Sequence, residues 1–185
     1  MPALPKLERP TPKHAVEFAQ RLFLQGERVE LNALVEALGI GRTTLYRWVG
    51  DRERLMGLVL ADMIDIGWDQ ALDSAEGEGL ERAMHAGRRF MEITATFPPV
   101  RQFAEREPQL ALRVLLAPDG LVAERIRAGF RRALQENGED VNDELIDIAV
   151  QAGTALEWAP IAIGGEPEIE RASRLIRSLF DATLG

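Results

Sequence analysis

The chain has 185 residues, of which 46% are hydrophobic and 28% are charged, as in a globular protein with a packed core. It contains no cysteine, which excludes disulfides and thiolate metal sites. Its first twenty residues hold four prolines among charged residues and no signal-peptide core, and no apolar run approaches the roughly 18 residues that span a bilayer. These features predict a soluble cytoplasmic protein.

The net charge of −8 is unevenly distributed along the chain. Residues 1–60 carry nine Lys or Arg against seven Asp or Glu, whereas residues 61–185 carry thirteen against twenty-three. Phosphate would repel the acidic second part but not the first. We therefore predict two domains, residues 1–60 and 61–185, of which the first can approach nucleic acid.

The whole chain is predicted to be helical, because apolar residues recur at i, i+3 and i+4 and no stretch sustains an alternation of period two. Thr11 and Pro12 begin a first helix, and Gly26 ends it. A second helix over residues 31–38 and a short third helix over residues 42–48 follow, with a tight turn between them.

Asp51 caps a long fourth helix that runs to about Ser74. Between Leu55 and Ile66 this helix is apolar on nearly every side, which is typical of a helix buried between two bodies. We expect it to connect the two domains. Further helices are expected over residues 80–96, on either side of Pro108, from residues 119–120 to Gly138, and over residues 142–163 and 167–184.

The short third helix separates its side chains into an inner and an outer face. With Leu45 on the inner face and 100° per residue, Thr43 and Arg47 point outward, and Thr44 and Tyr46 lie on the flanks. A helix in a major groove needs this division, because outward side chains meet base edges while flanking hydroxyls meet phosphates.

The surrounding residues complete a helix-turn-helix. The second helix and the turn at residues 39–41 position the short helix, and Arg52 lies where the next helix points its first N–H groups toward a phosphate. A solvated surface helix is the alternative, because this geometry also occurs in proteins that do not bind DNA. The predicted DNA contacts are Arg42, Thr43, Thr44, Tyr46, Arg47 and Arg52.

The segment LNALVEALGIGRTTLYRWVGDRERLMGLVL resembles the DNA-binding domain of the TetR-type repressors, over residues 12 to about 60. Gly41 replaces the Ser or Thr cap of most members, which weakens the helix start by about a few tenths of a kcal/mol. Glu30 replaces the usual Thr cap of the preceding helix. The residues that match the family pattern are Leu45, Tyr46, Trp48, Arg52, Glu53 and Leu55.

The second part also resembles this family. FPPVRQFAEREPQLALRVLL and GTALEWAPIAIGGEPEIERASRLI are similar to the C-terminal domain of regulators related to the one that controls quorum-signal lactone degradation. This resemblance implies that the body dimerises through its last two helices and holds a ligand pocket whose occupancy releases DNA. It also implies a lactone-like signal as the ligand.

The apolar faces of the last two helices independently favour dimerisation. Small residues on one face of the helix over residues 142–163 allow two helix backbones to approach closely, and two such helices per chain make a four-helix interface. The alternative is that both faces pack on the chain's own core. The predicted interface residues are Ala149, Ala152, Ala155, Ala159, Ile169, Ala172, Leu175, Ile176 and Leu179.

Large apolar residues of the body are candidates for a ligand pocket, although such residues at helical spacing also build ordinary cores. We expect a small, largely apolar ligand with one polar group. The candidate pocket residues are Trp68, Phe90, Met91, Phe97, Phe103 and Trp158.

The sequence offers no catalytic or metal-binding pattern. Glu81 and His85 share one helix face, which fits a surface pair better than a metal site. No nucleophile elbow, P-loop or dinucleotide motif is present. We predict no enzyme activity, no metal and no cofactor.

The predicted fold is all-α, with a three-helix helix-turn-helix DNA-binding domain joined by a long helix to a helical ligand-binding and dimerisation domain. The predicted function is a ligand-responsive transcriptional repressor. It would bind a palindromic operator in double-stranded DNA as a homodimer and be released by a small-molecule inducer. The alternative is a helical ligand-binding or protein-interaction module without DNA binding, against which the outward set Thr43, Tyr46 and Arg47 argues.

Overall fold

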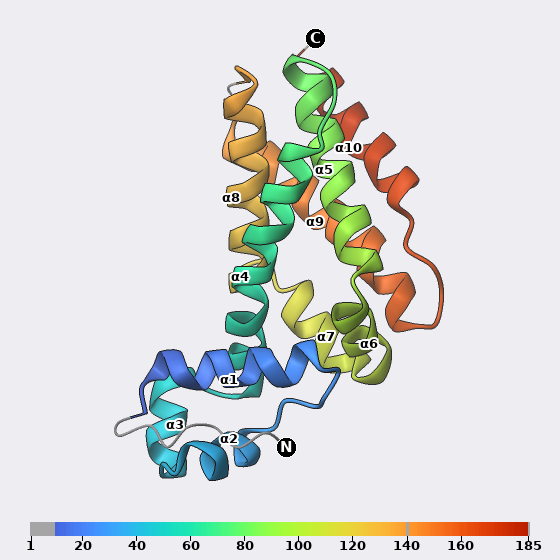
Figure 1. Ribbon diagram of the computed structural model, residues 1–185. Coiled ribbons are helices and arrows are strands. Elements are labelled where there is room, and N and C mark those ends of the chain that lie inside the picture. Colours follow the sequence, from blue (N-terminus) through green and yellow to red (C-terminus); the bar gives the residue numbers. More distant parts are fainter. Residues whose placement is uncertain (1–9, 140, 185) are drawn as a thin grey trace. The chain divides into compact units, whose positions relative to one another are not determined.

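The computed structural model describes residues 10–139 and 141–184, and every regular element within these ranges is a helix (Figure 1). The chain divides into two compact units, Met1–Leu60 and Ala61–Gly185. The all-α prediction is confirmed, and each helix expected from the sequence is present within a few residues of its expected ends.

The first three helices of the first unit pack on one another, and the start of a fourth helix completes the unit. Thr11 begins the first helix, because its Oγ1 accepts a hydrogen bond from the backbone N–H of His14 at 3.4 Å and Pro12 follows at the first position. Leu34 and Leu45 are completely buried in its core. The helices are α1 (Pro12–Leu24), α2 (Leu31–Leu38), α3 (Arg42–Val49) and the first part of α4 (Arg52–Asp73).

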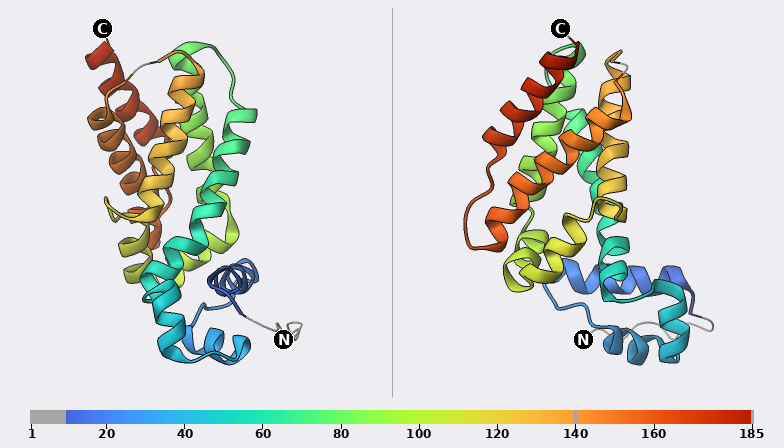
Figure 2. Two further views of the ribbon diagram at one scale, coloured as in Figure 1. Left: turned by 90° about the vertical axis from the view of Figure 1, so that its left-hand side faces the viewer. Right: turned by 180° about the vertical axis from the view of Figure 1, so that it is seen from behind.

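The second unit is a bundle that takes in the rest of α4. Pro98 and Pro108 start two of its helices, and the Asn142 side chain caps a third by accepting from the Leu145 N–H at 2.8 Å. Its helices α9 and α10 lie side by side, and both contact α5 (Figure 2). The helices are α5 (Gly79–Thr96), α6 (Pro98–Arg106), α7 (Pro108–Leu115), α8 (Leu121–Glu136), α9 (Asp143–Ala162) and α10 (Ile169–Leu184).

Four aromatic residues from four helices form the centre of the second unit. Trp68 of α4 stacks on Phe90 of α5, with ring centroids 4.4 Å apart and planes 8° apart. Phe130 of α8 lies 6.1 Å from Trp68 and meets Phe180 of α10 edge-on at 5.8 Å. Such pairs contribute about 0.5–1.5 kcal/mol beyond the burial of their area. The aromatic cluster therefore joins α4, α5, α8 and α10.

Most of α4 between Leu55 and Ile66 is buried, as expected, but the expectation is wrong for Ile66. Ile66 is 56% exposed, and Asp62, Asp69 and Gln70 are exposed as well. These residues recur at intervals of three and four, so they form one solvent-facing stripe along the helix. Ile66 was expected to be buried because it is apolar, but single exposed apolar residues are normal on protein surfaces.

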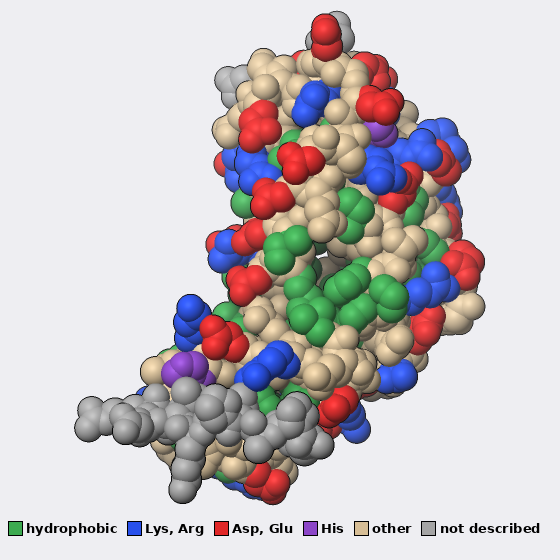
Figure 3. Space-filling view, viewed as in Figure 1, with side chains coloured by type: hydrophobic (Ala, Val, Ile, Leu, Met, Phe, Trp, Pro, Cys, Tyr) green, Lys and Arg blue, Asp and Glu red, His purple; other side chains and the backbone are tan. Residues whose placement is uncertain are grey.

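Charged side chains are distributed over the surface of the second unit. On the face shown in Figure 3, acidic and basic residues alternate over much of this unit, and hydrophobic side chains gather around a hollow. None of the described helices combines the length and the apolar character that a membrane span requires.

Candidate nucleic-acid interface and ligand cavity

The short helix α3 is held by two glycine turns and two buried side chains. Gly39 adopts the left-handed conformation (φ 63°, ψ 33°) that ends α2 and allows the tight turn into α3. Gly50, also at positive φ, ends α3. Leu45 and Val49 are completely buried and fix the inner face of α3. This local structure is the helix-turn-helix that the sequence predicted.

The outer face of α3 carries exposed side chains of the kinds that read DNA. Arg42, Thr43, Tyr46 and Arg47 are exposed, and Thr44 is half-buried on the flank. The arginines offer guanidinium groups for guanine or phosphate, the Thr43 methyl suits thymine, and the Tyr46 hydroxyl suits a phosphate oxygen. Five of the six predicted DNA contacts therefore lie together on or beside one surface of α3.

Arg52, the sixth predicted contact, is engaged inside the first unit. Its Nε donates to the Val29 carbonyl oxygen at 2.6 Å, and one of its terminal nitrogens lies 4.0 Å from the Glu30 carboxylate. Its side chain is only 19% exposed. Arg52 therefore ties the start of α4 to the loop before α2, and we remove it from the proposed DNA contacts. Family likeness drew attention to the right residue, but its charge serves the fold.

The start of α4 is capped as the sequence predicted. The Asp51 Oδ1 accepts a hydrogen bond from the backbone N–H of Arg54 at 2.8 Å. A carboxylate at this position satisfies an unpaired helix N–H group and complements the positive end of the helix dipole. The boundary between α3 and α4 is therefore set by Gly50 and Asp51.

The second unit contains a cavity of about 710 Å³. Three of the six predicted ligand residues, Trp68, Phe90 and Met91, line it. Among the described residues, Phe97, Phe103 and Trp158 are not part of its lining, and Phe103 and Trp158 are core residues. Further apolar lining comes from Met84, Ile126, Phe130, Ala149, Val150 and Ile176.

The wall of the cavity depends on a close approach between α4 and α8. A Cβ atom at Gly129 would lie 2.2 Å from Cδ1 and 2.4 Å from Nε1 of Trp68, far inside van der Waals contact. The indole can therefore lie against the backbone of α8 because residue 129 has no side chain. The Trp68 ring is thereby held in its stack on Phe90.

Glu157 of α9 is a buried acidic group in the cavity wall, where the polar Thr154 is buried as well. Glu157 is 2% exposed, and its Oε1 lies 2.5 Å from the Thr94 Oγ1. Burial raises the pKa of the Glu157 carboxyl to about 8, although hydrogen bonds from Thr94 and the Trp158 side chain lower it. Glu157 was not among the residues predicted from the sequence. The available signal was one acidic residue within the apolar run of residues 152–163.

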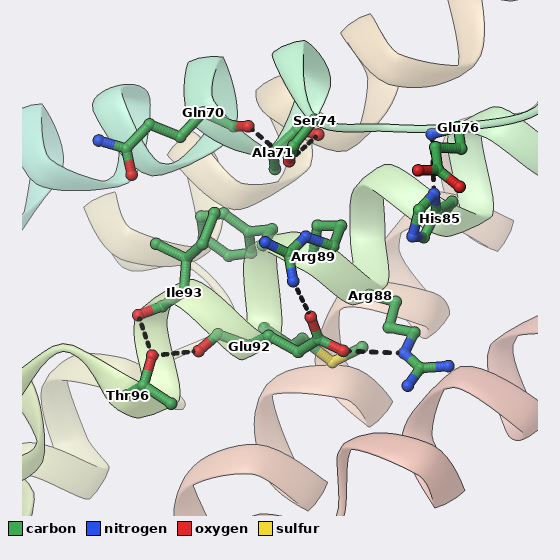
Figure 4. Close-up of polar contacts among 12 residues, drawn as sticks. Gln70, Ala71, Ser74, Glu76, His85, Arg88, Arg89, Glu92, Ile93 and Thr96 are labelled. Atoms are coloured by element: carbon green, nitrogen blue, oxygen red, sulfur yellow. Dashed lines mark hydrogen bonds and ion pairs between the residues drawn. The ribbon is translucent and has the colours of Figure 1, made fainter.

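Ion pairs and hydrogen bonds organise the charged part of the cavity lining. Glu81 pairs with Arg177 at 2.5 Å, and the His85 Nδ1 accepts the Glu76 backbone N–H at 2.8 Å, so Glu81 and His85 have different partners. Arg88 bonds both Glu170 and Glu92. Figure 4 shows Arg88 and Arg89 converging on the Glu92 carboxylate and His85 beside Glu76.

The last two helices keep an exposed apolar surface. Ile148 of α9 is 45% exposed and Leu175 of α10 is 43% exposed, and Ala155 is exposed between them in sequence. Ala149 and Ala172 are instead buried within the protomer, so they belong to its core and are not available to a partner. The other predicted interface residues are half-buried: Ala152, Ala159, Ile169, Ile176 and Leu179.

A family model for the tetracyclin repressor-like C-terminal domain matches residues 78–181, which is more than half of the chain. The chain belongs to the TetR family. No curated protein matches the sequence. The family recognised from the helix-turn-helix residues is thus confirmed by the other half of the molecule.

Two solved TetR-family structures show the same fold. The transcriptional repressor QsdR of R. erythropolis has 28% identity and a TM-score of 0.85, and the match covers 93% of this chain and 96% of QsdR. The repressor AlkX of Dietzia sp., implicated in biodegradation of n-alkanes, has 20% identity and a TM-score of 0.59, over 95% of this chain and 97% of AlkX. TetR-family repressors bind DNA as dimers and respond to small-molecule ligands, and they are generally not enzymes.

Proposed function

We propose that this TetR-family protein is a repressor that binds a palindromic operator as a homodimer and is released by a small-molecule inducer. The observation that carries this proposal is the outer face of α3. Thr43, Tyr46 and Arg47 are exposed on a helix whose inner residues Leu45 and Val49 are completely buried. Exposed polar side chains on a fixed short helix are what a major groove requires.

The test is to select bound sequences from a random double-stranded DNA pool and to measure affinity by gel shift. We expect a site with two-fold symmetry, because a symmetric dimer presents two copies of α3. Arg47→Ala should weaken binding by about 1–3 kcal/mol and relax preference at one position in each half-site.

Arg28→Ala is the matched control for this substitution. It removes the same charge from the same unit, at a loop residue whose guanidinium already bonds Glu30 at 2.7 Å. It should keep the sequence preference. Selection of no sequence at all, or equal effects of both substitutions, would favour a ligand-binding module without DNA recognition.

The homodimer is proposed to form through the exposed faces of α9 and α10. Ile148→Asp should convert a dimer to a monomer in analytical ultracentrifugation at micromolar concentration, because it places a charge in an apolar interface. Ile66→Asp changes another exposed isoleucine, on α4, and should leave the dimer intact. A wild-type monomer at this concentration would refute the dimer.

Inducer release is proposed to depend on the cavity of the second unit. Helix α4 begins at Arg52 in the first unit and ends at Asp73 in the second. Trp68, which lines the cavity, lies on this helix. A ligand can shift DNA affinity only by its different affinity for the DNA-bound and released states. Typical couplings of about 1–3 kcal/mol correspond to about 5- to 150-fold. By reciprocity, operator DNA should weaken an inducer by the same factor, and equal affinities with and without operator would refute that inducer.

A further inference from the structure

The cavity wall contains an acidic group that has neutral hydrogen-bond partners. The Glu157 Oε1 lies 2.5 Å from the hydroxyl oxygen of Thr94, which is uncharged. Its apolar neighbours in the lining include Met91, Val150 and Phe90. An ionised carboxylate in such surroundings is costly unless a cation accompanies it.

We propose that Glu157, as a neutral carboxylic acid, anchors the polar head of an uncharged and largely apolar ligand in this cavity. The ligand class is a hydroxyl- or amide-bearing molecule with an aliphatic body. This inference rests on the proposed function in that it names the chemistry of the inducer. Its test uses no DNA, so it can fail or succeed separately from operator binding.

The hydrogen bonds of Thr94 support the neutral form. The Thr94 Oγ1 lies 2.9 Å from the Phe90 carbonyl oxygen and 2.5 Å from the Glu157 Oε1, but a threonine hydroxyl has one hydrogen to donate. If Glu157 is protonated, it donates to Thr94 and Thr94 donates to Phe90, so both contacts are hydrogen bonds. If Glu157 is ionised, Thr94 must leave the carbonyl to donate to the carboxylate. The second carboxyl oxygen then remains to meet the ligand.

The charges that share the cavity with Glu157 already have partners of their own or lie in solvent. Arg88 pairs with Glu170 and Arg177 pairs with Glu81, while Arg174 is exposed. The His85 Nδ1 accepts a hydrogen bond from the Glu76 backbone N–H, and Glu76 itself is exposed. Burial is what raises the Glu157 pKa, and no charged neighbour contributes to it. On the helices packed against α9, the remaining charged side chains include Arg89, Glu92, Arg101, Arg106, Arg113 and Arg127.

The size and lining of the cavity set the body of the ligand. A volume of about 710 Å³ lies within the usual range for small-molecule sites, which are mostly apolar with a few placed polar groups. A ten-carbon chain fits within this volume. Binding should therefore come from burial of the chain, with Glu157 fixing the orientation of the head.

The experiment compares three ten-carbon probes: decan-1-ol, decylamine and decanoate. Binding is followed by tryptophan fluorescence in the full chain, since Trp68 lines the cavity and Trp158 is the neighbour of Glu157 in the sequence. We expect decan-1-ol to bind most tightly. Its affinity for the wild type should fall about tenfold between pH 7 and pH 9, because the acid form of a group with a pKa of about 8 decreases tenfold over this range.

Two variants assign the pH dependence. Glu157→Gln keeps the shape and the hydrogen bonding but does not titrate, so it should bind decan-1-ol with no change between pH 7 and pH 9. His85→Gln replaces the histidine of the cavity lining and should behave as the wild type. Thermal unfolding at each pH shows that both variants are folded.

Three results would overturn the proposal. Tightest binding of decylamine, with loss in Glu157→Gln, would make Glu157 the counter-ion of a cationic ligand. A pH-independent wild type, or a pH dependence that His85→Gln abolishes, would remove Glu157 from the site. Failure of all three probes to bind would refute an aliphatic ligand, because an apolar cavity of this volume has room for the chain.

Discussion

Glu157 should make the stability of the protein fall as the pH rises. Its pKa is about 8 in the folded chain, above its ordinary value of 4.5, so the folded state holds a proton that the unfolded state releases. Stability from this group is complete below pH 4.5 and is lost progressively up to about pH 8. A difference of three to four pH units corresponds to about 5 kcal/mol, since each unit is worth about 1.4 kcal/mol.

Glu157→Gln isolates this effect because glutamine does not titrate. Urea denaturation of both proteins at pH 5, 7 and 9 and at one protein concentration gives the difference in free energy of unfolding. A Trp48→Phe background leaves Trp68 and Trp158, which both report on the second unit. The variant should gain stability relative to the wild type by several kcal/mol between pH 5 and pH 9.

Glu124→Gln is the control, because Glu124 is exposed on α8 and its substitution should shift the curves little at any pH. Groups that titrate equally in wild type and variant cancel in the comparison. Parallel stability curves for the wild type and Glu157→Gln would refute the reasoning, since they would mean that the buried carboxyl titrates alike in the folded and unfolded chains.

Three further substitutions test other parts of the structure. Tyr46→Phe should weaken binding to all DNA sequences about equally in a selection experiment, because a flanking hydroxyl meets phosphate; a changed sequence preference would contradict this. Asp51→Ala should lower the urea midpoint by the equivalent of about 1 kcal/mol through loss of the α4 cap, while Asp51→Asn should keep most of it. Gly129→Ala should destabilise the second unit by about 1–3 kcal/mol in thermal unfolding, because the added methyl collides with Trp68.

The helices could be predicted because their signals are local. Thr11, Gly39 and Asp51 act on their own turns, and the spacing of apolar residues reports which face is buried. The exposed face of α3 follows from the same rule once Leu45 points inward. For this reason the exposure of Thr43 and Arg47 could be predicted, while their contact with DNA stays a prediction.

The cavity could not be read from the sequence because it is made by residues far apart in the chain. Trp68, Phe90 and Glu157 come from three helices, and their meeting depends on packing rather than on local propensity. Phe103 and Phe90 are both buried phenylalanines, but only Phe90 lines the cavity. The hydrogen bond from Arg52 to Val29 could not be predicted for a similar reason, since the two residues lie 23 positions apart in the chain.

In α3, the residues that pack into the core are not the residues that face outward. Leu45 and Val49 supply the buried contacts, while Thr43 and Arg47 contribute little to the core. Substitutions at exposed positions usually change stability by less than about 0.5 kcal/mol. Mutations at residues 43 and 47 can therefore accumulate during evolution without loss of the folded protein. A duplicated copy of this gene could acquire a new operator through these two positions while its ligand cavity stays unchanged.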